Sequence, residues 1–594
     1  MNYLDWIVLF TTVLFIVLYG TWKTRKTATM EGYLKGDNSM KWWMIGVSIM
    51  ATQASAITFL STTGQGMEDG MRFIQFYFGL PIAMVIISVT MVPIYYRLKV
   101  FTAYEYLETR FDAKTRSLAA FLFLIGRGVS AGITLFAPSL ILSTILHWPV
   151  AITTFLIGTL VIIYVTSGGT KAVSLTQRQQ LAVVMTSMIV AGLIALYKLP
   201  DNVSFGDSIQ IAGLLGKFNM INFLPANIES NLPEGVSSVS ELSLWQKVDL
   251  ISKDRYNMWF GLLASIFLFL SYFGTDQSQV GRYLGGVSIT ESRLGLMFNG
   301  LLKIPMQFII LFIGVLVFVF YLFFQPPVFY NQELRDRALD TPMADSVRFI
   351  EEQFSEVYSK KRIAVDEMVK AIQQEDEGQI KRHVDRVKAF QSEEGALRND
   401  MKKIIEKAIP NAKTQDRDYI FLNFVLSYLP NGIIGLLLAV IFLAAMSSMA
   451  GELNALVSTT SIDVYKRSIN KDASSAHYLK ASRWFTIGWA VLAMIFAMLA
   501  SFAENLIQFV NIVGSLYYGT LLGIFLVAFY IKRIGGTAVF WAAILSECIV
   551  VYCYRYTDIA FLLYNVIGCG AVIGISLLLQ QVLPTKAATA EQKP

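Results

Sequence analysis

Long apolar stretches recur along the whole chain, and this repetition limits the possible folds more than any other feature. A transmembrane helix needs about 20 apolar residues to cross a hydrocarbon core of ~30 Å. Hydrophobic residues make up 55% of the 594 residues and charged residues only 15%, whereas soluble domains carry about 25% charge. The sequence therefore predicts an all-α polytopic membrane protein with about 13 transmembrane helices. We place them near residues 4–22, 41–64, 74–96, 117–146, 149–166, 179–198, 257–276, 294–324, 419–462, 484–502, 506–530, 537–555 and 559–582.

Basic residues gather in alternate loops between these stretches. Cytoplasmic loops carry an excess of Lys and Arg, so the net charge of +6 reports membrane orientation and not nucleic-acid binding. The short loops on the other side carry little beyond Arg72 and Arg555. We expect a multi-pass protein of the plasma (bacterial inner) membrane, with its N-terminus outside and its C-terminus in the cytoplasm. The loops expected inside carry Lys23, Arg25, Lys26, Lys35, Lys41, Arg97, Lys99, Arg110, Lys114, Arg116, Lys466, Arg467, Lys471, Lys480, Arg483, Lys532 and Arg533.

The first apolar stretch is expected to remain in the mature protein. No basic residue precedes it, no small-residue cleavage site follows, and its positive charges come after the apolar run. A signal peptide has the opposite arrangement.

Two segments expected outside the membrane are long. Residues 199–256 are polar with few helical cues. Residues 331–416 are dense in charge and show helical apolar spacing, which predicts a soluble helical hairpin over the outer face. The hairpin is either a solvated spacer or a surface for a partner, and both interpretations stay open.

Residues typical of catalysis are scarce. Cys548, Cys553 and Cys569 lie inside the last two apolar stretches, and the three histidines lie in loops or in the polar insertion. They form neither a disulfide framework nor a metal-binding pattern. We expect no enzyme activity and no organic cofactor.

Several stretches contain groups that lipid would reject. The segment "SIMATQASAITFLSTTGQG" (48–66) is polar at nearly every other residue, and a helix interrupted at Ala51–Ala54 would free backbone carbonyls at the middle of the membrane. Arg127 and Lys303 also lie inside apolar stretches, where an ionisable group indicates function. Arg127 has the alternative of snorkelling or pairing with a carbonyl, and Lys303 that of a structural role.

Two adjacent serines, Ser447 and Ser448, follow the apolar segment "NGIIGLLLAVIFL". Small residues recur around them at helical spacing, which lets a neighbouring backbone approach closely. Close packing explains Ala and Gly but not two hydroxyls, whereas a hard cation would use both as oxygen ligands.

Five segments together resemble the sodium/solute symporter family, which includes sodium/glucose, sodium/proline, sodium/sialic acid and sodium/monocarboxylate cotransporters. The similarity covers about residues 1–535 apart from 331–416. The segments are "YEYLETRF" (104–111), "TSGGTKAVSLTQ" (166–177), "DQSQVGRYL" (276–284), "LLKIPMQF" (301–308) and "AAMSSMAGELNALVSTTSIDVYKR" (444–467).

The resemblance implies a LeuT-like core of five-plus-five inverted repeats, with a broken first helix in each repeat. The repeats would span 41–198 and 257–530, the second carrying the insertion 331–416. Residues 1–40 would form an extra helix and a cytoplasmic loop, 199–256 an outer loop, and 531–594 two further helices and a short tail.

The resemblance also implies a sodium-coupled symporter that imports a small polar organic solute by alternating access. Sodium would be held by carbonyls of Ala51, Ala54 and Ala444 and by the hydroxyls of Ser447 and Ser448. Family members with a second sodium site have an Asp and two Ser at positions that are Gln177, Ala450 and Gly451 here. We therefore predict one sodium per cycle. Glu452 is the alternative coupling group, in a proton-coupled transporter.

The solute site is compared with that of the sugar transporters of the family. Lys303 and Tyr272 match a sugar-contacting Lys and a gating Tyr, and Asn511 stands where a Gln would be. Gln53, Ile57, Thr58, Tyr77 and Phe269 stand where an Asn, an acid, a Gln, another acid and an Asn would be, which predicts a less acidic, more aromatic pocket. Lys303 and Arg127, pointing inward, favour an anion. A sugar acid or other carboxylate is favoured, with a neutral sugar or polyol as the alternative.

A non-transporting sensor or a channel on the same core is the competing class. A sensor would carry an appended kinase, and a channel would need a polar stripe along several helices. Here the polar groups lie at one depth, which favours transport.

Overall fold

The computed structural model describes residues 2–24, 40–98, 100–146, 148–223, 241–254, 256–410, 412, 414–500 and 506–583. Helix accounts for 84% of it, and the described residues form no strand, only an isolated bridge between Met40 and Gly286. Nine of the described helical segments are long and apolar enough to span a membrane. The predicted all-α membrane fold is confirmed.

The first half of the core is built around a broken helix. α3 ends at Gln53 and α4 begins at Ala56, because Ala54 (ψ 65°) and Ser55 (ψ 173°) leave helical geometry. The break thus lies slightly later than the predicted interruption at 51–54, and Ala51 stays in the last turn of α3. The elements of this half are α1 (Tyr3–Thr24), α3 (Trp42–Gln53), α4 (Ala56–Asp69), η1 (Gly70–Tyr77), α5 (Leu80–Leu98), α6 (Glu105–Arg110), α7 (Ala113–Leu146) and α8 (Val150–Tyr197).

The helix α8 differs from the sequence prediction. It is continuous over 48 residues, where we expected separate spans at 149–166 and 179–198. The polar stretch between them stays helical, because the backbone hydrogen bonds of a helix do not depend on side-chain polarity. Gln179–Tyr197 alone has the length and hydropathy of a span, and Val150–Thr166 is a shorter apolar helix.

The second half also begins with a broken helix. α11 ends at Gly274 and α12 begins at Gln277, with Asp276 capping α12 by accepting from Ser278 N. The predicted stretch 419–462 is two helices, because Pro430 and Gly432 (φ 87°) interrupt it. The elements are η4 (Phe260–Ala264), α11 (Ser265–Gly274), α12 (Gln277–Tyr283), α13 (Ile289–Phe323), η5 (Arg417–Tyr419), α17 (Ile420–Tyr428), α18 (Ile433–Thr459), η6 (Thr460–Ile469), α19 (Ser475–Ala500) and α20 (Leu506–Tyr530).

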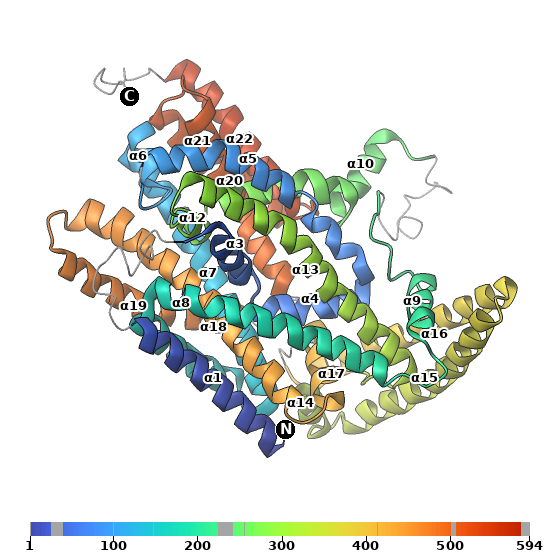
Figure 1. Cartoon of the computed structure of the whole chain (residues 1–594). Coiled ribbons are helices and arrows are strands. Elements are labelled where there is room, and N and C mark those ends of the chain that lie inside the picture. Colours follow the sequence, from blue (N-terminus) through green and yellow to red (C-terminus); the bar gives the residue numbers. More distant parts are fainter. Residues whose placement is uncertain are drawn as a thin grey trace.

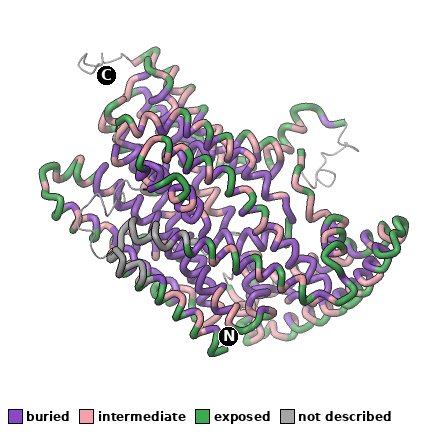
Figure 2. The backbone as a smooth tube through the Cα atoms, in the orientation of Figure 1, coloured by how far each residue is buried: buried purple, intermediate pink, exposed green. Residues whose placement is uncertain are grey.

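The helix α18 lies at the centre of the bundle. It contacts α1, α3, α7, α8 and α12, and 89% of its most apolar window is buried, against 28% for α19. Small residues make this possible: Gly435 faces the backbone of Asp5 so closely that a Cβ would clash. Figure 2 shows the buried backbone concentrated in the middle of the molecule.

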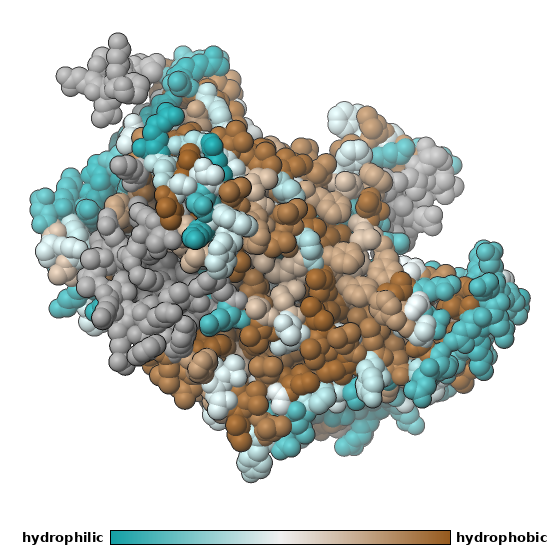
Figure 3. All heavy atoms as spheres, viewed as in Figure 1, coloured by the Kyte–Doolittle hydropathy of each residue, from teal (hydrophilic) through white to brown (hydrophobic). Residues whose placement is uncertain are grey.

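The remaining helices lie around this bundle. α15 and α16 pack against each other and extend to one side of it (Figure 1). Hydrophilic side chains cover them, whereas hydrophobic side chains dominate the surface over α13 (Figure 3). These peripheral elements are α9 (Phe205–Leu214), α10 (Leu244–Lys253), α14 (Gln332–Leu339), α15 (Ala344–Gln373), α16 (Glu377–Ala408), α21 (Gly536–Tyr556) and α22 (Leu562–Val582).

Candidate functional site

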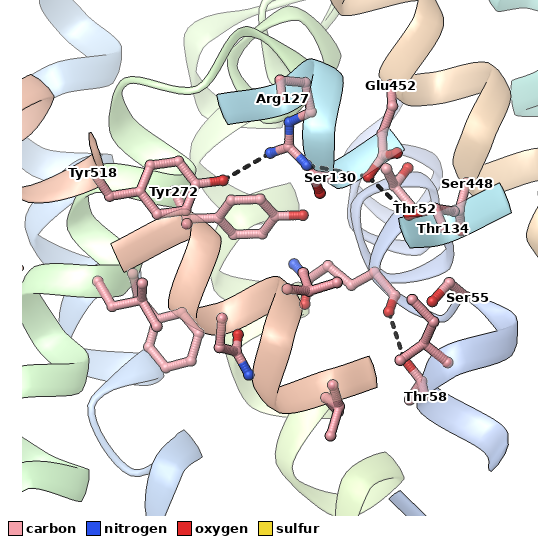
Figure 4. Close-up of a pocket in the computed structure, with 18 of the residues that line it drawn as sticks. Thr52, Ser55, Thr58, Arg127, Ser130, Thr134, Tyr272, Ser448, Glu452 and Tyr518 are labelled. Atoms are coloured by element: carbon pink, nitrogen blue, oxygen red, sulfur yellow. Dashed lines mark hydrogen bonds and ion pairs between the residues drawn. The ribbon is translucent and has the colours of Figure 1, made fainter. Parts of the chain in front are cut away.

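A cavity of about 130 Å³ lies beside the α3–α4 break. Residues of α7, α11, α13, α18 and α20 complete its wall (Figure 4). All eight residues predicted to contact the solute line this one cavity, and Ile57 also lines it. The eight are Gln53, Thr58, Tyr77, Arg127, Phe269, Tyr272, Lys303 and Asn511.

Aromatic rings form one wall of the cavity. Tyr77 and Phe269 stack with ring centroids 6.0 Å apart, and Phe76 meets Phe269 edge-on at 5.4 Å. Tyr272 packs against Tyr518 of α20 at 5.8 Å. Such rings contribute large, rigid apolar area with few rotamers, so this wall gives the cavity a defined shape.

Polar groups of the broken helix form the facing wall. Thr58 Oγ1 donates to the Gln53 carbonyl at 2.8 Å, across the break. Gln53 Nε2 is buried without a hydrogen-bond partner among the described residues. A buried donor of this kind is costly unless something accepts from it, so it is available to a solute oxygen.

Lys303 brings a buried basic side chain to the cavity. It is 2% exposed and its Nζ lies 5.9 Å from the ring centroid of Tyr77. It makes no ion pair with any residue that the structure describes. A buried ammonium group strongly favours an anionic partner.

Arg127 differs from Lys303, because carboxylates already neutralise it. Its guanidinium pairs with Asp276 and, at 3.2 Å, with Glu452 Oε1, and it donates to Tyr518 Oη at 2.8 Å. Figure 4 shows Arg127 between Glu452 and Tyr518. Neither snorkelling nor carbonyl pairing describes Arg127, because it is 3% exposed and paired with two acids. The net positive charge of the cavity is therefore lower than it would be if Arg127 and Lys303 were both unpaired cations.

The predicted sodium ligands lie at the break and on α18. The last four backbone carbonyls of a helix have no intrahelical partner. In α3, the carbonyl of Ala51 is one of these four. Ser448 and Ser55 both line the cavity. Ser55 is the residue that follows Ala54 in the sequence. The hydroxyls of Ser447 and Ser448 are each 1% exposed and have no hydrogen-bond partner among the described residues.

This donor set fits a sodium ion. Ser hydroxyls and freed backbone carbonyls are neutral oxygens, which hard cations prefer. Ala444, one turn before Ser448 on α18, is buried as well. In the described part of the chain, no group of three His, Cys, Asp or Glu is arranged to hold a metal.

Three residues of the site had no role in the sequence prediction. Asp276 pairs with Arg127 and accepts from Tyr518 Oη at 2.9 Å, and Thr134 faces Glu452 at 3.4 Å. Asp276 lies in the break between α11 and α12. An arginine inside a span pairs with another ionisable group or with backbone carbonyls, so the sequence signals a partner for Arg127 without identifying Asp276.

A second ionic cluster lies at η6, directly after the C-terminal end of α18. Arg116 pairs with Asp463 at 2.7 Å and with Glu108 at 2.8 Å, and Arg467 also pairs with Glu108. The hydrogen bond from Arg467, with a further contribution from Arg116, lowers the pKa of Glu108 from 4.5 to about 2. The cluster joins α6 and α7 to η6.

Broken helices beside a central cavity are typical of secondary transporters. A sequence model of the sodium:solute symporter family matches residues 33–230 and 399–546, more than half of the chain. The chain belongs to the sodium:solute symporter family.

The chain is similar to several characterised symporters. It is 24% identical to the sodium/sialic acid symporter SiaT of Proteus mirabilis over 96% of this chain and 94% of that protein. It is 22% identical to the rabbit (Oryctolagus cuniculus) sodium/glucose cotransporter 1 over 91% and 70%. It is 27% identical to human sodium-coupled monocarboxylate transporter 2 over 47% and 40%.

The fold is that of a solved Na+-coupled sialic acid symporter in a substrate-bound, outward-open state. The TM-score is 0.72 at 20% identity, covering 98% of each chain. This likeness confirms the LeuT-like architecture. The protein is thus a multi-pass, sodium-coupled solute symporter with Na+ as its coupling ion.

Proposed function

We propose that the protein imports a small organic anion, a sugar acid or other carboxylate, with one sodium ion per cycle. The observation that carries this proposal is Lys303, a buried basic side chain that lines the cavity without an acidic partner among the described residues. A solute carboxylate would complete the pair, and charge-assisted hydrogen bonds are strong in such surroundings.

A neutral sugar is the second candidate. The stacked rings of Tyr77 and Phe269 support it, because aromatic faces also suit sugars. The unpaired ammonium of Lys303 is more costly in that complex, so we rank the sugar second.

For the ions, we propose that sodium binds between Ala51, Ala54, Ala444, Ser447 and Ser448. The two unpartnered hydroxyls support this assignment. Glu452 is paired with Arg127, and it stays the coupling group of the alternative, a proton-coupled transporter. We further propose that the N-terminus lies outside and the C-terminus in the cytoplasm, from the basic loops.

The proposal is tested by thermal unfolding of the purified protein with a panel of short carboxylates, sugar acids and neutral sugars, with and without sodium. Ligands that bind only the folded state raise stability, by about 2.7 kcal/mol at 100 times Kd. We expect sodium to stabilise the protein and carboxylates to stabilise it further only with sodium. Stabilisation by neutral sugars alone would favour the second candidate, and the absence of any sodium effect would contradict the ion site.

A further inference from the structure

The C-terminal end of α4, remote from the cavity, is held from two sides. On one side, Lys217 in the turn after α9 donates from Nζ to the carbonyl of Met67 at 2.8 Å and to that of Glu68 at 2.6 Å. The last carbonyls of a helix have no intrahelical partner, and a cation is favoured beside them. On the other side, η5 contacts α4 directly. The outer half of the first broken helix is therefore fixed at its far end.

Arg417 of η5 makes the hold on this second side. Its guanidinium pairs with Glu68 and, at 3.5 Å, with Asp69, and it donates to Gln65 Oε1 at 2.9 Å. A Cβ at Gly64 would come within 2.5 Å of the Arg417 carbonyl oxygen, so the two backbones lie against each other. Residues three and four apart share one face of a helix. One guanidinium thus joins three acceptors on one face of α4, and such a network holds better than an isolated surface pair.

The residue before Arg417 is fastened to the insertion 331–416. Asp416 is 4% exposed, accepts from Tyr330 N at 2.7 Å, and pairs with Lys402 Nζ at 3.2 Å. Lys402 lies in α16, the second long helix of the insertion, and Tyr330 directly precedes the insertion in the chain. The position of Arg417 is therefore set by both ends of the insertion.

The residue after Arg417 is fastened to α20. Asp418 Oδ2 accepts from Leu506 N, at the first residue of that helix, at 3.2 Å. Both α20 and α4 line the cavity, α20 with Val510 and Asn511 and α4 with Thr58. Residues 416–418 therefore connect the insertion to two helices of the cavity wall.

We propose that Arg417 is a positioning residue that fastens the outer half of the first broken helix, and that the insertion 331–416 holds Arg417 in place. The contacts form while α4 packs against η5, and they break when the outer half of α4 moves away to admit the solute. On this account the insertion sets how readily the cavity opens, and it is not a solvated spacer. The inference rests on the proposed function for the orientation of the chain and for solute entry from outside.

The test measures how fast a residue of the cavity reacts from outside. Val510→Cys is prepared in a chain whose native cysteines, Cys548, Cys553 and Cys569, are replaced by Ala. It is labelled in intact cells with a membrane-impermeant thiol reagent, in medium without added sodium or solute. We expect Arg417→Gln to raise the labelling rate about tenfold, because charge-assisted hydrogen bonds that hold the closed arrangement are lost.

Two further variants separate the insertion's role from a general loss of charge. Lys402→Gln removes the pair with Asp416, so the labelling rate should rise in the same direction. Arg335→Gln is the matched control, because it breaks a pair with Glu351 that is similarly exposed but lies inside the insertion. In this variant the labelling rate should stay at the wild-type value.

Glu68→Gln keeps the inference testable if Arg417→Gln does not fold. It weakens the same network from α4, so the labelling rate should rise. The double variant Arg417→Gln/Glu68→Gln should add little to either single change, because members of one network are not additive.

A lower melting temperature with an unchanged labelling rate in Arg417→Gln and Glu68→Gln would show that the network only stabilises the fold, and it would overturn the inference. An equal rise in Arg335→Gln would overturn it as well. An unchanged rate in Lys402→Gln would overturn the role of the insertion. A protein that responds to neither sodium nor carboxylates in the thermal assay would instead contradict the proposed function, since the labelling assay uses neither ligand.

Discussion

At the scale of single residues, the cavity separates two cations by their partners. Arg127 is held by Asp276 and Glu452, so it organises the inner wall of the cavity. Lys303 makes no ion pair with any described residue, and its Nζ lies 5.9 Å from the ring centroid of Tyr77. The charge available to a solute is therefore that of Lys303.

We predict that Lys303→Met weakens binding of the carboxylate solute by about 30- to 100-fold, because a charge-assisted pair is lost. Sodium binding should stay within about twofold. Isothermal titration with solute at saturating sodium measures the first effect, and the sodium-dependent thermal shift the second. Lys303→Arg is the control that keeps the charge. Parallel loss of sodium and solute binding in Lys303→Met would show a structural role instead.

Replacing either Ser447 or Ser448 by Ala should raise the sodium concentration for half-maximal stabilisation by about tenfold, the loss of one good oxygen ligand. The change removes no hydrogen bond recorded among the described residues, so stability without sodium should be unchanged. Ser458→Ala, about three turns further along α18, is the matched control. A lower melting temperature in the absence of sodium, with unchanged sodium affinity, would identify the serines as packing residues.

At the scale of elements, an ionic cluster ties α6 and α7 to η6. Glu108 accepts from Arg116 and Arg467, and these contacts lower its pKa to about 2. A carboxyl group whose pKa is depressed in the folded state stabilises the fold above its unfolded value, here 4.5. The stabilisation is lost as the pH falls toward the folded value.

We therefore predict that Glu108→Gln lowers thermal stability at pH 6–8, and that the difference from the wild type shrinks as the pH falls from about 4.5 toward 2. Melting curves of both proteins across this range measure the effect. Glu105→Gln is a suitable control, because the carboxylate of Glu105 lies farther from Arg116, at 3.9 Å, than that of Glu108, at 2.8 Å. A difference that is the same at every pH would show that the charge of Glu108 does not contribute.

The hairpin of α15 and α16 encloses an ion pair. Lys361 Nζ and Glu394 Oε2 are 2.6 Å apart, and the two residues are 3% and 6% exposed. Burial lowers the pKa of Lys361, against the opposing effect of Glu394. Removing one partner of a buried pair costs about 3–5 kcal/mol, whereas replacing both by apolar residues is often neutral.

Lys361→Met should therefore open the hairpin, and Lys361→Met/Glu394→Leu should restore it. Limited proteolysis of the full chain measures the effect, since cleavage follows the open population. We expect cleavage within 344–408 to accelerate by about a hundredfold or more in the single variant. Equal cleavage rates in the single variant and the wild type would contradict a stabilising pair.

At the scale of the whole molecule, the apolar stretches and five short motifs were sufficient to predict the fold class, the family and sodium coupling. Seven solute residues predicted by resemblance and Arg127, predicted as an ionisable residue inside a span, line one cavity, although their roles stay predictions. The partners of Arg127 were not predictable in the same way, because Asp276 and Glu452 are 149 and 325 residues away in the chain. The continuity of α8 was missed because its polar residues were interpreted as a loop. The side chains of 167–176 lie outside the described part of the chain.

The ion stoichiometry has consequences for the whole transport cycle. One charge moved through 100 mV is worth about 2.3 kcal/mol, and a tenfold sodium gradient about 1.4 kcal/mol. One sodium with a neutral solute could concentrate it about 500-fold. A monoanion carried one-to-one moves no net charge, so it reaches about tenfold and does not respond to voltage.

Uptake into proteoliposomes therefore tests sodium-coupled anion import most directly. A labelled short carboxylate that binds in the thermal assay is followed under an imposed sodium gradient, with and without a potassium diffusion potential. We predict accumulation that requires sodium, depends on it with a Hill coefficient near one, and is the same with and without the potential. Uptake without sodium, or uptake with a Hill coefficient near two that is accelerated by an inside-negative potential, would contradict the one-sodium, one-anion mechanism.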